Sequence, residues 1–378
     1  MGRPKGSKNK KTIEREMREQ AKKAFKKAPL FVILVVLVIV CILGYLYFKD
    51  KQKTKEPNFV IGDDYIYLSE KDKIFDEMKV TFIELLDDNK KGKIGDSVFI
   101  EYGDVDILID AGDKNEGSNT VVPFIEAHCE DDILELVIVT HADADHLGGM
   151  VGLSSSVGAL EVPGITYMYL VDFGYVGDTK LYNDYVELRQ SLIDNGTKYY
   201  DIADIFTNEN NPSNFYLGKD ATLSLLDYQT YANDEIDDDN DRSVSCLLVH
   251  QEHKFLLCGD AEKKEEVVLA NLNIGHVDVF KSNHHGSSTS NSDALLSNIT
   301  PNYVVICSSE SNSYNLPEKV IINRLLNYTE KVFATFINGN VVFTSKNNEL
   351  SVSCSKSSND LYIQNSEWYN TDDPENPR

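Results

Sequence analysis

Short apolar runs in this chain repeatedly stop at an aspartate or a histidine, and this pattern constrains the fold more than any other feature. Residues 133–139 form such a run, and THADADHLGG at 140–149 follows it directly. Other apolar runs stop at Asp110, at Asp260 and at the histidine pair 284–285. The rigid edge of a sheet can present such strand ends as converging ligands. Four ends of this kind indicate a site rather than surface decoration.

From residue 79 onward, short strand-like runs alternate with helical stretches, without an internal repeat. Strands are expected at 80–84, 97–102, 106–109, 134–139, 166–171, 221–226, 244–249, 255–257, 277–281, 303–307, 332–335, 341–344 and 350–353. Helices are expected near 119–127, 181–195, 261–272, 291–298 and 317–327. Many strands with interspersed helices imply an α/β fold of two sheets with helices packed outside them.

The uncharged stretch at residues 30–48 predicts one transmembrane helix. At about 1.5 Å per residue it spans roughly the 30 Å hydrocarbon core of a bilayer. A cleaved signal peptide is the alternative, although the stretch is longer than a usual signal core and no small-residue cleavage site follows it. The expected organisation is a basic cytoplasmic segment 1–28, a transmembrane helix 29–48, a linker 49–72, a folded domain 73–356 and a polar tail 357–378.

Charge divides the chain sharply at the predicted membrane helix. Residues 1–48 hold 11 Lys or Arg and 3 acids, or +8, and because the whole chain carries −24, residues 49–378 carry −32. The basic excess predicts a cytoplasmic N-terminus and places the folded domain outside the cell membrane. Such an acidic domain disfavours indiscriminate binding of nucleic acid, unless a local basic groove or a bound metal offsets the repulsion.

Three further features suggest no separate function. The opening GRPKGSKNKK resembles the core of an AT-hook, but membrane topology or anionic lipid explains a short basic segment at least as well. The six cysteines show no paired spacing, so buried free thiols are expected rather than disulfides or a zinc ribbon. The acidic run at 234–241 lacks the glycine and spaced glutamate of a calcium loop and is expected to be solvated.

The loop after residues 133–139 offers the ligand types that hydrolytic divalent metals use, imidazole nitrogen and carboxylate oxygen. These ligands are His141, Asp143, Asp145 and His146. A polar turn that happens to hold two histidines is the alternative. Asp143 stands where a loop of this shape usually carries another histidine, and a carboxylate there extends the plausible metals from zinc to manganese. The glycines at 148–149 are expected to let the following helix begin close to the site.

These motifs and their order resemble the metallo-β-lactamase superfamily, and within it the C-terminal hydrolase part of the competence protein ComEC. The similar pieces are Gly95-Asp96-Ser97, DILIDAG at 106–112, THADADHLGG at 140–149, NDRSVSCLL at 240–248, LLCGDAE at 256–262, HHGSSTSNS at 284–292 and NGNVVFTS at 338–345. The resemblance covers about residues 77–355. It implies the four-layer αββα sandwich of that superfamily for the domain at 73–356, and a hydrolytic site that holds one or two divalent ions, zinc or manganese.

Carried over residue by residue, the resemblance assigns ligands to two metals. One metal would be held by His141 and Asp143, and the other by Asp145, His146 and one of His284 or His285. The expected catalytic residues are Asp145, His284 and His285.

Two other acidic residues complete the implied site. Asp260 would bridge the metals, and Asp110 would accept a ligand imidazole N–H and fix its tautomer. The first metal remains short of ligands, so Asp241 or a water completes its shell, or that metal binds weakly. His250 and His253 bracket a strand turn and are expected to be exposed.

The resemblance implies a phosphodiesterase or nuclease in which a water, its pKa lowered by metal, attacks phosphorus. DNA is the implied substrate, the lipid bilayer is the expected partner of residues 29–48, and no stable protein partner is predictable. Leu316 departs from the family, since relatives often carry the histidine of Gly-His-Pro there and leucine can neither bind metal nor donate a proton. Two alternatives therefore stay open, a hydrolase of small esters or phosphoesters and a membrane-tethered binding module that has lost catalysis.

Overall fold

The computed structural model describes residues 15, 18, 19, 65–207, 213–226, 238–310 and 312–356. The chain divides into two compact units, Met1–Asn58 and Phe59–Arg378, and nearly all described residues belong to the second unit. The predicted membrane helix at 29–48 and the tail at 357–378 lie outside the described residues. Among the residues that are described, no helix has the length and apolar character needed to cross a bilayer.

The first sheet combines strands from both ends of the second unit. Its strands are β2 (Glu77–Phe82), β3 (Val98–Tyr102), β4 (Val105–Ile109), β5 (Ile133–Ile138), β8 (Thr166–Asp172), β9 (Lys198–Asp201), β17 (Val341–Lys346) and β18 (Glu349–Cys354). Their order is β18-β17-β2-β3-β4-β5-β8-β9, antiparallel as far as β4 and parallel from β4 to β9. The parallel half brings the carboxyl ends of β4, β5 and β8 to one edge.

The second sheet has the same mixed character. Its strands are β1 (Tyr65–Tyr67), β10 (Asn214–Tyr216), β11 (Ala221–Leu225), β12 (Cys246–His250), β13 (His253–Leu257), β14 (Val279–Lys281), β15 (Tyr303–Ile306) and β16 (Val332–Ala334). They lie in this order, antiparallel from β10 to β13 and parallel from β13 to β16. The carboxyl ends of β13, β14 and β15 therefore also share an edge.

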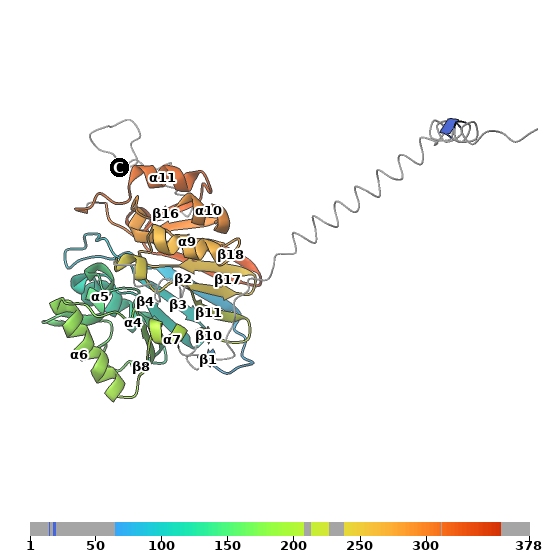
Figure 1. Cartoon of the computed structure of the whole chain (residues 1–378). Coiled ribbons are helices and arrows are strands. Elements are labelled where there is room, and N and C mark those ends of the chain that lie inside the picture. The colour runs from blue at the N-terminus through green and yellow to red at the C-terminus, as the bar shows by residue number, and fades with distance from the viewer. Residues whose placement is uncertain are drawn as a thin grey trace, which may run out of the picture. The chain divides into compact units, whose positions relative to one another are not determined.

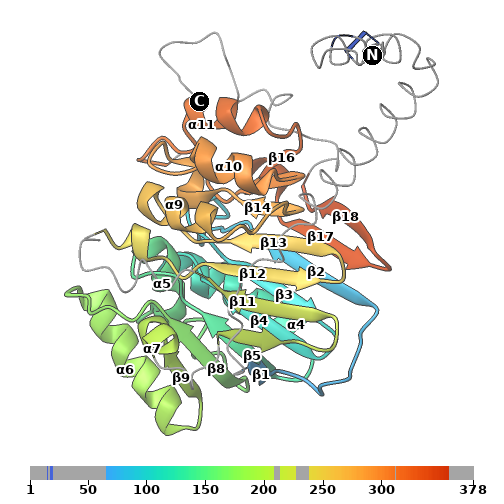
Figure 2. The same ribbon diagram turned by 45° about the vertical axis from the view of Figure 1, so that its right-hand side comes forward.

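Helices connect and cover these strands. They are α3 (Lys114–Glu116), η1 (Gly117–Val121), α4 (Val122–His128), α5 (Ala144–Val151), α6 (Lys180–Asp194), α7 (Ile202–Thr207), η2 (Asn240–Arg242), α9 (Lys263–Asn271), η3 (Asn283–Gly286), α10 (Asp293–Ile299), α11 (Lys319–Leu326) and α12 (Thr335–Asn338). A small hairpin, β6 (Gly152–Leu153) and β7 (Ser156–Val157), follows α5. In Figures 1 and 2, α9, α10 and α11 gather beside β14 and β16, away from α5 and α6.

Alternate residues of the second sheet belong to two different hydrophobic clusters, which establishes the layers. Phe255 and Leu257 of β13 join the larger cluster, which contains core residues of both sheets. Leu256, between them, joins a smaller cluster with Leu269 of α9 and Leu296 of α10. Because side chains alternate across a strand, one face of this sheet packs on the first sheet and the other on helices. The predicted sandwich of two sheets with helices outside is confirmed.

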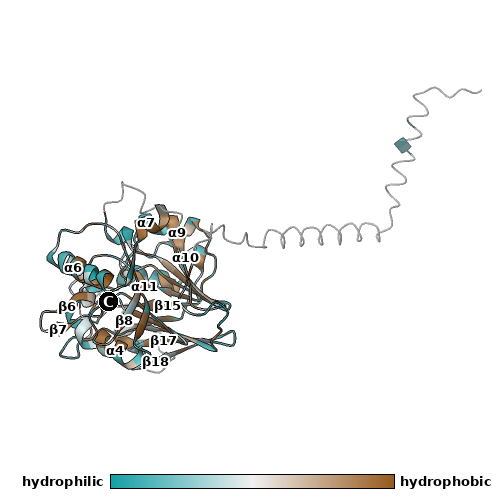
Figure 3. Cartoon of the chain, turned by 90° about the horizontal axis from the view of Figure 1, so that it is seen from below, coloured by the Kyte–Doolittle hydropathy of each residue, from teal (hydrophilic) through white to brown (hydrophobic). Residues whose placement is uncertain are grey.

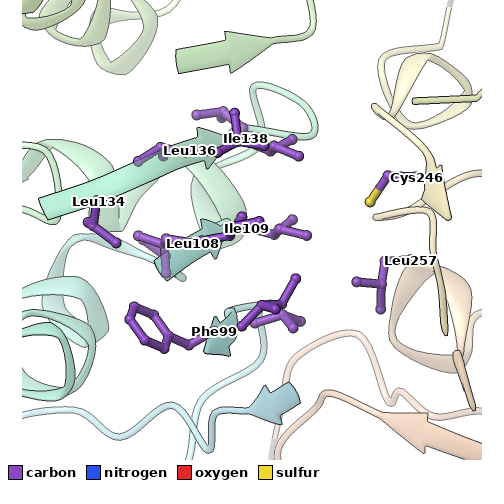
Figure 4. Packing of buried hydrophobic residues seen from close by; sticks show 14 of the residues in the cluster. Phe99, Leu108, Ile109, Leu134, Leu136, Ile138, Cys246 and Leu257 are labelled. Atoms are coloured by element: carbon purple, nitrogen blue, oxygen red, sulfur yellow. The ribbon is translucent and has the colours of Figure 1, made fainter. Parts of the chain in front are cut away.

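The larger cluster is the main hydrophobic core, and it includes side chains on both faces of the first sheet. Figure 4 shows eight of its residues, Phe99, Leu108, Ile109, Leu134, Leu136 and Ile138 of the first sheet and Cys246 and Leu257 of the second. All eight are buried. By contrast, α6 lies outside the first sheet and carries hydrophilic residues on its surface (Figure 3). Burial of a single Leu or Phe contributes about 1.5–3 kcal/mol, so this cluster is the main source of stability.

Several expectations from the sequence differ from the structure. Residues 65–72, expected in the linker, include β1, which pairs with β10. His250, expected to be exposed, is fully buried at the end of β12, and its Nδ1 lies 2.8 Å from Ser345 Oγ. The neighbouring strand β17, which carries Ser345, covers it. The expectation of buried free thiols is confirmed for Cys129, Cys246, Cys258 and Cys307.

The helix after β5 begins earlier than expected. It starts at Ala144, so the glycines at 148–149 lie inside α5 rather than before it. A side chain at Gly149 would place its Cβ 1.9 Å from the carbonyl oxygen of Ala111 and 2.9 Å from Gly117 Cα. The glycines thus let α5 pack directly on the backbone that follows Asp110.

Gly149→Ala is expected to lower the free energy of unfolding by about 3 kcal/mol, because neither backbone neighbour can move cheaply. Urea unfolding measures this effect. Gly92→Ala is the control, since a Cβ at Gly92 would have its nearest neighbour 3.9 Å away and no strained backbone angle. Equal stability of the two variants would contradict the close packing of α5.

Candidate metal centre

The carboxyl ends of strands from both sheets meet at one place. In the first sheet, Asp110 follows β4, and His141 and His146 follow β5. In the second sheet, Asp260 follows β13 and His285 follows β14. His146 Nε2 lies 3.3 Å from His285 Nε2, so the two edges are in direct contact. The convergence expected from the sequence is therefore present.

Four buried side chains form the centre of this edge. Atoms of Asp96, His146, Asp260 and His285 lie within 4.8 Å of one another. Asp260 Oδ2 is 3.3 Å from His146 Nε2 and 3.1 Å from His285 Nε2. This mixture of imidazole and carboxylate is compatible with a divalent metal.

The two buried imidazoles are held so that their Nε2 atoms converge. Nδ1 of His146 lies 2.8 Å from Asp110 Oδ2, and Nδ1 of His285 lies 2.8 Å from the carbonyl oxygen of Cys307. Each ring can thus donate Nδ1–H away from the centre and keep Nε2 toward it. Such outer partners fix the tautomer of metal-binding histidines.

His141 has the same arrangement. Its Nδ1 is 3.0 Å from Thr140 Oγ1, which itself donates to Asp110 Oδ2 at 2.6 Å. Burial and the nearby His146 lower the pKa of His141 to about 3, so the imidazole is neutral. Its Nε2 is buried and has no hydrogen-bond partner among the described residues. A neutral ring with an unused buried lone pair fits a metal ligand.

Asp143 and Asp145 border the centre with different exposure. Asp143 Oδ2 is 3.9 Å from His141 Nε2, and the Asp143 side chain is 53% exposed. Asp145 Oδ2 is 3.2 Å from His285 Nε2. Burial opposes ionisation of Asp145, but His285 and His146 lower its pKa below the usual value. Asp143 therefore lies beside His141, and Asp145 lies beside the other histidines.

Asp241, the other candidate ligand for the first metal, has a structural contact instead. Its Oδ1 accepts a hydrogen bond from the N–H of Glu265 in α9.

The two histidines of η3 differ in burial and in their position relative to the centre. His285 is fully buried in the centre, whereas His284 is 22% exposed and its Nε2 lies 3.9 Å from Asp260 Oδ2. Glu262 Oε1 is 3.2 Å from Nδ1 of His284 and can accept a hydrogen bond from it.

Three residues of the site have left-handed backbone. His284 and His285 have φ of 48° and 50°, and Asp110 has φ of 57°. Left-handed backbone at non-glycine residues costs about 1–3 kcal/mol each and gathers at functional sites.

Sequence reasoning missed an ion pair in the centre. Lys281 of β14 is 2% exposed, and its Nζ contacts Asp96 Oδ2 and lies 3.3 Å from Asp260 Oδ1. Burial disfavours the charged amine, but the carboxylates of Asp96 and Asp260 outweigh it and raise the pKa of Lys281. A lysine inside an apolar strand was the available signal, because buried charges are seldom unpaired.

A second acidic group lies at the opposite edge of the first sheet. Ligand-type atoms of Asp106, Cys129 and Asp131 lie within 4.8 Å of one another. Burial raises the pKa of Asp106 to about 7. Glu135, whose Oε2 accepts from the backbone N–H of Asp106, has its pKa raised to about 8 by burial and by Asp131. Near neutral pH Glu135 therefore keeps its proton for most of the time, and Asp106 is about half protonated.

This second group predicts a pH effect on stability. The folded pKa of Glu135 exceeds the unfolded value, so the folded state binds more protons and stability falls as pH rises from about 4 to 8. Glu135→Gln is expected to match the original chain near pH 5 and to exceed it near pH 8.5 by on the order of 2 kcal/mol. Urea unfolding at both pH values measures the difference, with the exposed Glu187→Gln as control. A pH-independent difference would contradict the assignment.

Comparison with known proteins adds the family context. No family model matches the chain. Recombination protein 2 of Haemophilus influenzae is 27% identical over 241 residues, which cover 62% of this chain and 26% of that protein. ComE operon protein 3 of Bacillus subtilis is 25% identical over 239 residues, which cover 61% of this chain and 27% of that protein. The chain thus spans about a quarter of the length of these curated relatives.

Among solved structures, the metallo-β-lactamase fold protein YhfI from Bacillus subtilis matches 68% of this chain and 95% of its own. The match has 12% identity and a TM-score of 0.41, a level of likeness that adds nothing to the assignment. The motifs, the sandwich of two sheets and the two curated relatives together show that this chain resembles the ComEC-type competence proteins and, more broadly, the metal-dependent hydrolases of the metallo-β-lactamase superfamily.

Proposed function

We propose that the chain is a membrane-anchored phosphodiesterase that uses zinc or manganese and acts outside the cell, with DNA as a candidate substrate. The observation that carries the proposal is the convergence of two buried Nε2 atoms on one carboxylate oxygen. Asp260 Oδ2 lies 3.3 Å from Nε2 of His146 and 3.1 Å from Nε2 of His285, and each ring has its Nδ1 beside an oxygen acceptor. The ring of His141 lies beside that of His146, with the two centroids 4.1 Å apart. This is the arrangement of metal ligands rather than of histidines that only stabilise a fold.

Two groups of ligands would hold the metal. Asp145, His146, Asp260 and His285 form the larger group, and His141 with Asp143 forms the smaller one. A divalent cation held there supplies Lewis acidity, which polarises a phosphoryl oxygen and lowers the pKa of a bound water. Asp110 would orient the imidazole of His146, and Lys281 would keep one oxygen of Asp260 away from the metal side.

His284 is suited to proton transfer. It is partly exposed at the rim, and Glu262 and Thr289 Oγ1 each lie 3.2 Å from its Nδ1. Its Nε2 can therefore hold the proton that the leaving oxygen needs. Leu316, the departure from the family pattern, is buried and its carbonyl oxygen accepts from Ser308 and Asn312. His284 is thus the proposed proton donor in a site that lacks the histidine of many relatives.

Two alternatives remain, each with a supporting observation. The net charge of −24 suits a small ester or phosphoester better than a long polyanion. Leu316 suits a tethered binding module without catalysis. The location of residues 29–48 in the cell membrane, with a cytoplasmic N-terminus, is part of the proposal and rests on the sequence.

The test measures metal content and turnover of the purified chain with added zinc or manganese. We expect bound metal and hydrolysis of bis(p-nitrophenyl) phosphate and of single-stranded DNA, both abolished by a chelator. Hydrolysis of a lactone or a small phosphoester alone would favour the small-molecule alternative. Failure to bind metal, with no substrate cleaved, would favour the binding module.

A further inference from the structure

A buried asparagine in the motif HHGSSTSNS has no role in the function described so far. The motif spans residues 284–292, and its chain turns back so that the side chain of Asn291 contacts the backbone just before His284. Asn291 is fully buried and has a φ of 57°, a left-handed value that asparagine adopts more readily than most residues. Its contacts therefore bear on how the two histidines of the motif are placed.

The side chain of Asn291 uses both of its polar ends on the two residues before the histidine pair. Its Oδ1 accepts from Ser282 Oγ at 2.9 Å and from the N–H of Asn283 at 3.1 Å. Its Nδ2 donates to the carbonyl oxygen of Asn283 at 2.9 Å. One side chain thus bonds both backbone polar groups of Asn283, and this fixes the peptide plane that leads into His284.

Glu266 of α9 holds both sides of this contact. It is fully buried, and its Oε1 accepts from Asn283 Nδ2 at 2.9 Å and from the N–H of Asn291 at 2.6 Å. Its Oε2 accepts from the N–H of Ser292, the N-cap of α10, at 2.7 Å. Arg324 of α11 donates to the carbonyl oxygen of Asn291 at 2.9 Å. Asn291 is therefore held by α9, α10 and α11, which lie together in Figure 2.

The turn that follows needs such support, because His284 and His285 both have left-handed backbone, with φ of 48° and 50°. Non-glycine residues keep this conformation only where the surrounding structure fixes it. After the turn, the N–H of Ser287 donates to the carbonyl oxygen of His284 at 2.8 Å, and His285 Nδ1 lies 2.8 Å from the carbonyl oxygen of Cys307. Before the turn, the contacts of Asn291 and Glu266 fix the backbone.

We propose that Asn291 and Glu266 are positioning residues of the metal centre, which hold the left-handed turn that places Nε2 of His285 at 3.1 Å from Asp260 Oδ2. The inference rests on the metal centre of the proposed function. Asp110 gives His146 a comparable support from the first sheet, through its contact with Nδ1 at 2.8 Å. Each sheet thus contributes both a histidine and the buried side chains that orient it.

Loss of this support acts on metal binding before it acts on the ligands themselves. Without the Asn291 side chain, His285 is still present, but the peptide before the turn can leave its conformation and the ring can leave its place beside Asp260. Outer partners of metal ligands typically contribute about 10- to 100-fold to metal affinity. The expected effect is therefore weaker metal binding by a chain that remains folded.

The test measures the zinc affinity of the full-length chain by competition with a chromophoric chelator. Asn291→Gly removes the side chain and keeps a residue that adopts left-handed backbone without strain. We expect zinc affinity to fall about 10- to 100-fold. Glu266→Gln places an amide N–H among three N–H donors and is expected to lower the affinity about tenfold. The double variant should lose less than the product of the two, because both residues hold one turn.

Two controls separate positioning from stability. Asn273→Gly makes the same change at an exposed asparagine with φ of 53°, whose Nδ2 donates to the carbonyl oxygen of Asn271 at 3.3 Å. Leu269→Ala removes a buried side chain of α9 from the smaller hydrophobic cluster and lowers stability through packing. Both controls should keep the original zinc affinity at a temperature where circular dichroism shows every variant to be folded.

The proposal is overturned if Asn291→Gly keeps the original zinc affinity, if either control weakens zinc binding as much, or if the original chain binds no zinc. If Asn291→Gly does not fold, Glu266→Gln decides by the same measurement. Turnover of bis(p-nitrophenyl) phosphate by the original chain is measured in parallel. Zinc binding without turnover would reject the proposed phosphodiesterase, whereas the zinc affinities of the variants still decide the role of Asn291 and Glu266.

Discussion

Replacing His146 by alanine is expected to lower phosphodiester hydrolysis by more than about a thousandfold and to remove at least one bound metal per chain. His146 is fully buried, and its two nitrogens connect Asp110 on one side with Asp260 on the other. Among the described residues, no other side chain contacts both Asp110 and Asp260, so the loss of His146 removes the link between these two carboxylates. Metal analysis and turnover of bis(p-nitrophenyl) phosphate measure the two effects.

A buried histidine outside the centre supplies the matched control. His250 is equally buried and lies beside Ser345 Oγ at the opposite end of β12. His250→Ala is expected to cost stability but to keep the metal and most of the activity at a temperature where it is folded. If both variants lose activity in proportion to their stability, His146 has only a structural role.

Removing the buried amine of Lys281 is expected to have the largest effect on stability. Lys281→Met leaves Asp96 and one oxygen of Asp260 without their cation in a buried environment. Losing one partner of a buried ion pair costs about 3–5 kcal/mol. Urea unfolding near neutral pH, with chelator in every sample, measures the change. The apolar chain of methionine keeps the volume of the lysine, so the effect reports on charge.

A double variant tests whether the ion pair is the cause. Lys281→Met combined with Asp96→Asn removes the uncompensated charge, and we expect it to recover part of the lost stability because it couples with the single change. Lys254→Met is the control, since within the described part of the chain the Lys254 amine has the carbonyl oxygen of Ile274, at 3.3 Å, as its hydrogen-bond partner and no carboxylate. A double variant less stable than the single variant would argue that Asp96 stabilises the fold independently of Lys281.

The larger strands were predictable because they are buried on both faces. Residues 134–139 were expected as a strand and β5 occupies Ile133–Ile138, since parallel strands under helices form almost continuous apolar runs. The edge strand β1 and its neighbour β10 escaped detection because they have only three residues each and contain polar or tyrosine side chains. The start of α5 was misplaced because close packing on Ala111 overrides the low helix propensity of Gly149.

The candidate ligands could be predicted from the residues at strand ends, but the side chains that contact them from the other sheet could not. Asp96 belonged to a recognised motif, yet nothing in its local sequence indicates that Lys281 of the other sheet contacts it. Likewise, the left-handed backbone at 284–285 decides which histidine enters the centre, and this turn is set by packing against the rest of the fold. Pairings across sheets depend on the complete sandwich, whereas strand ends depend on a few adjacent residues.

The centre draws its side chains from both sheets, and this has a mechanical consequence. Asp110 and His146 extend from the first sheet, and Asp260 and His285 extend from the second. A divalent ion bound by both sets of side chains would cross-link the two sheets at one rim of the sandwich. Its binding free energy would add to the free energy needed to open that rim. The amides near this rim would then exchange with solvent more slowly when the ion is bound, while the far rim, held by hydrocarbon contacts, would exchange at the same rate.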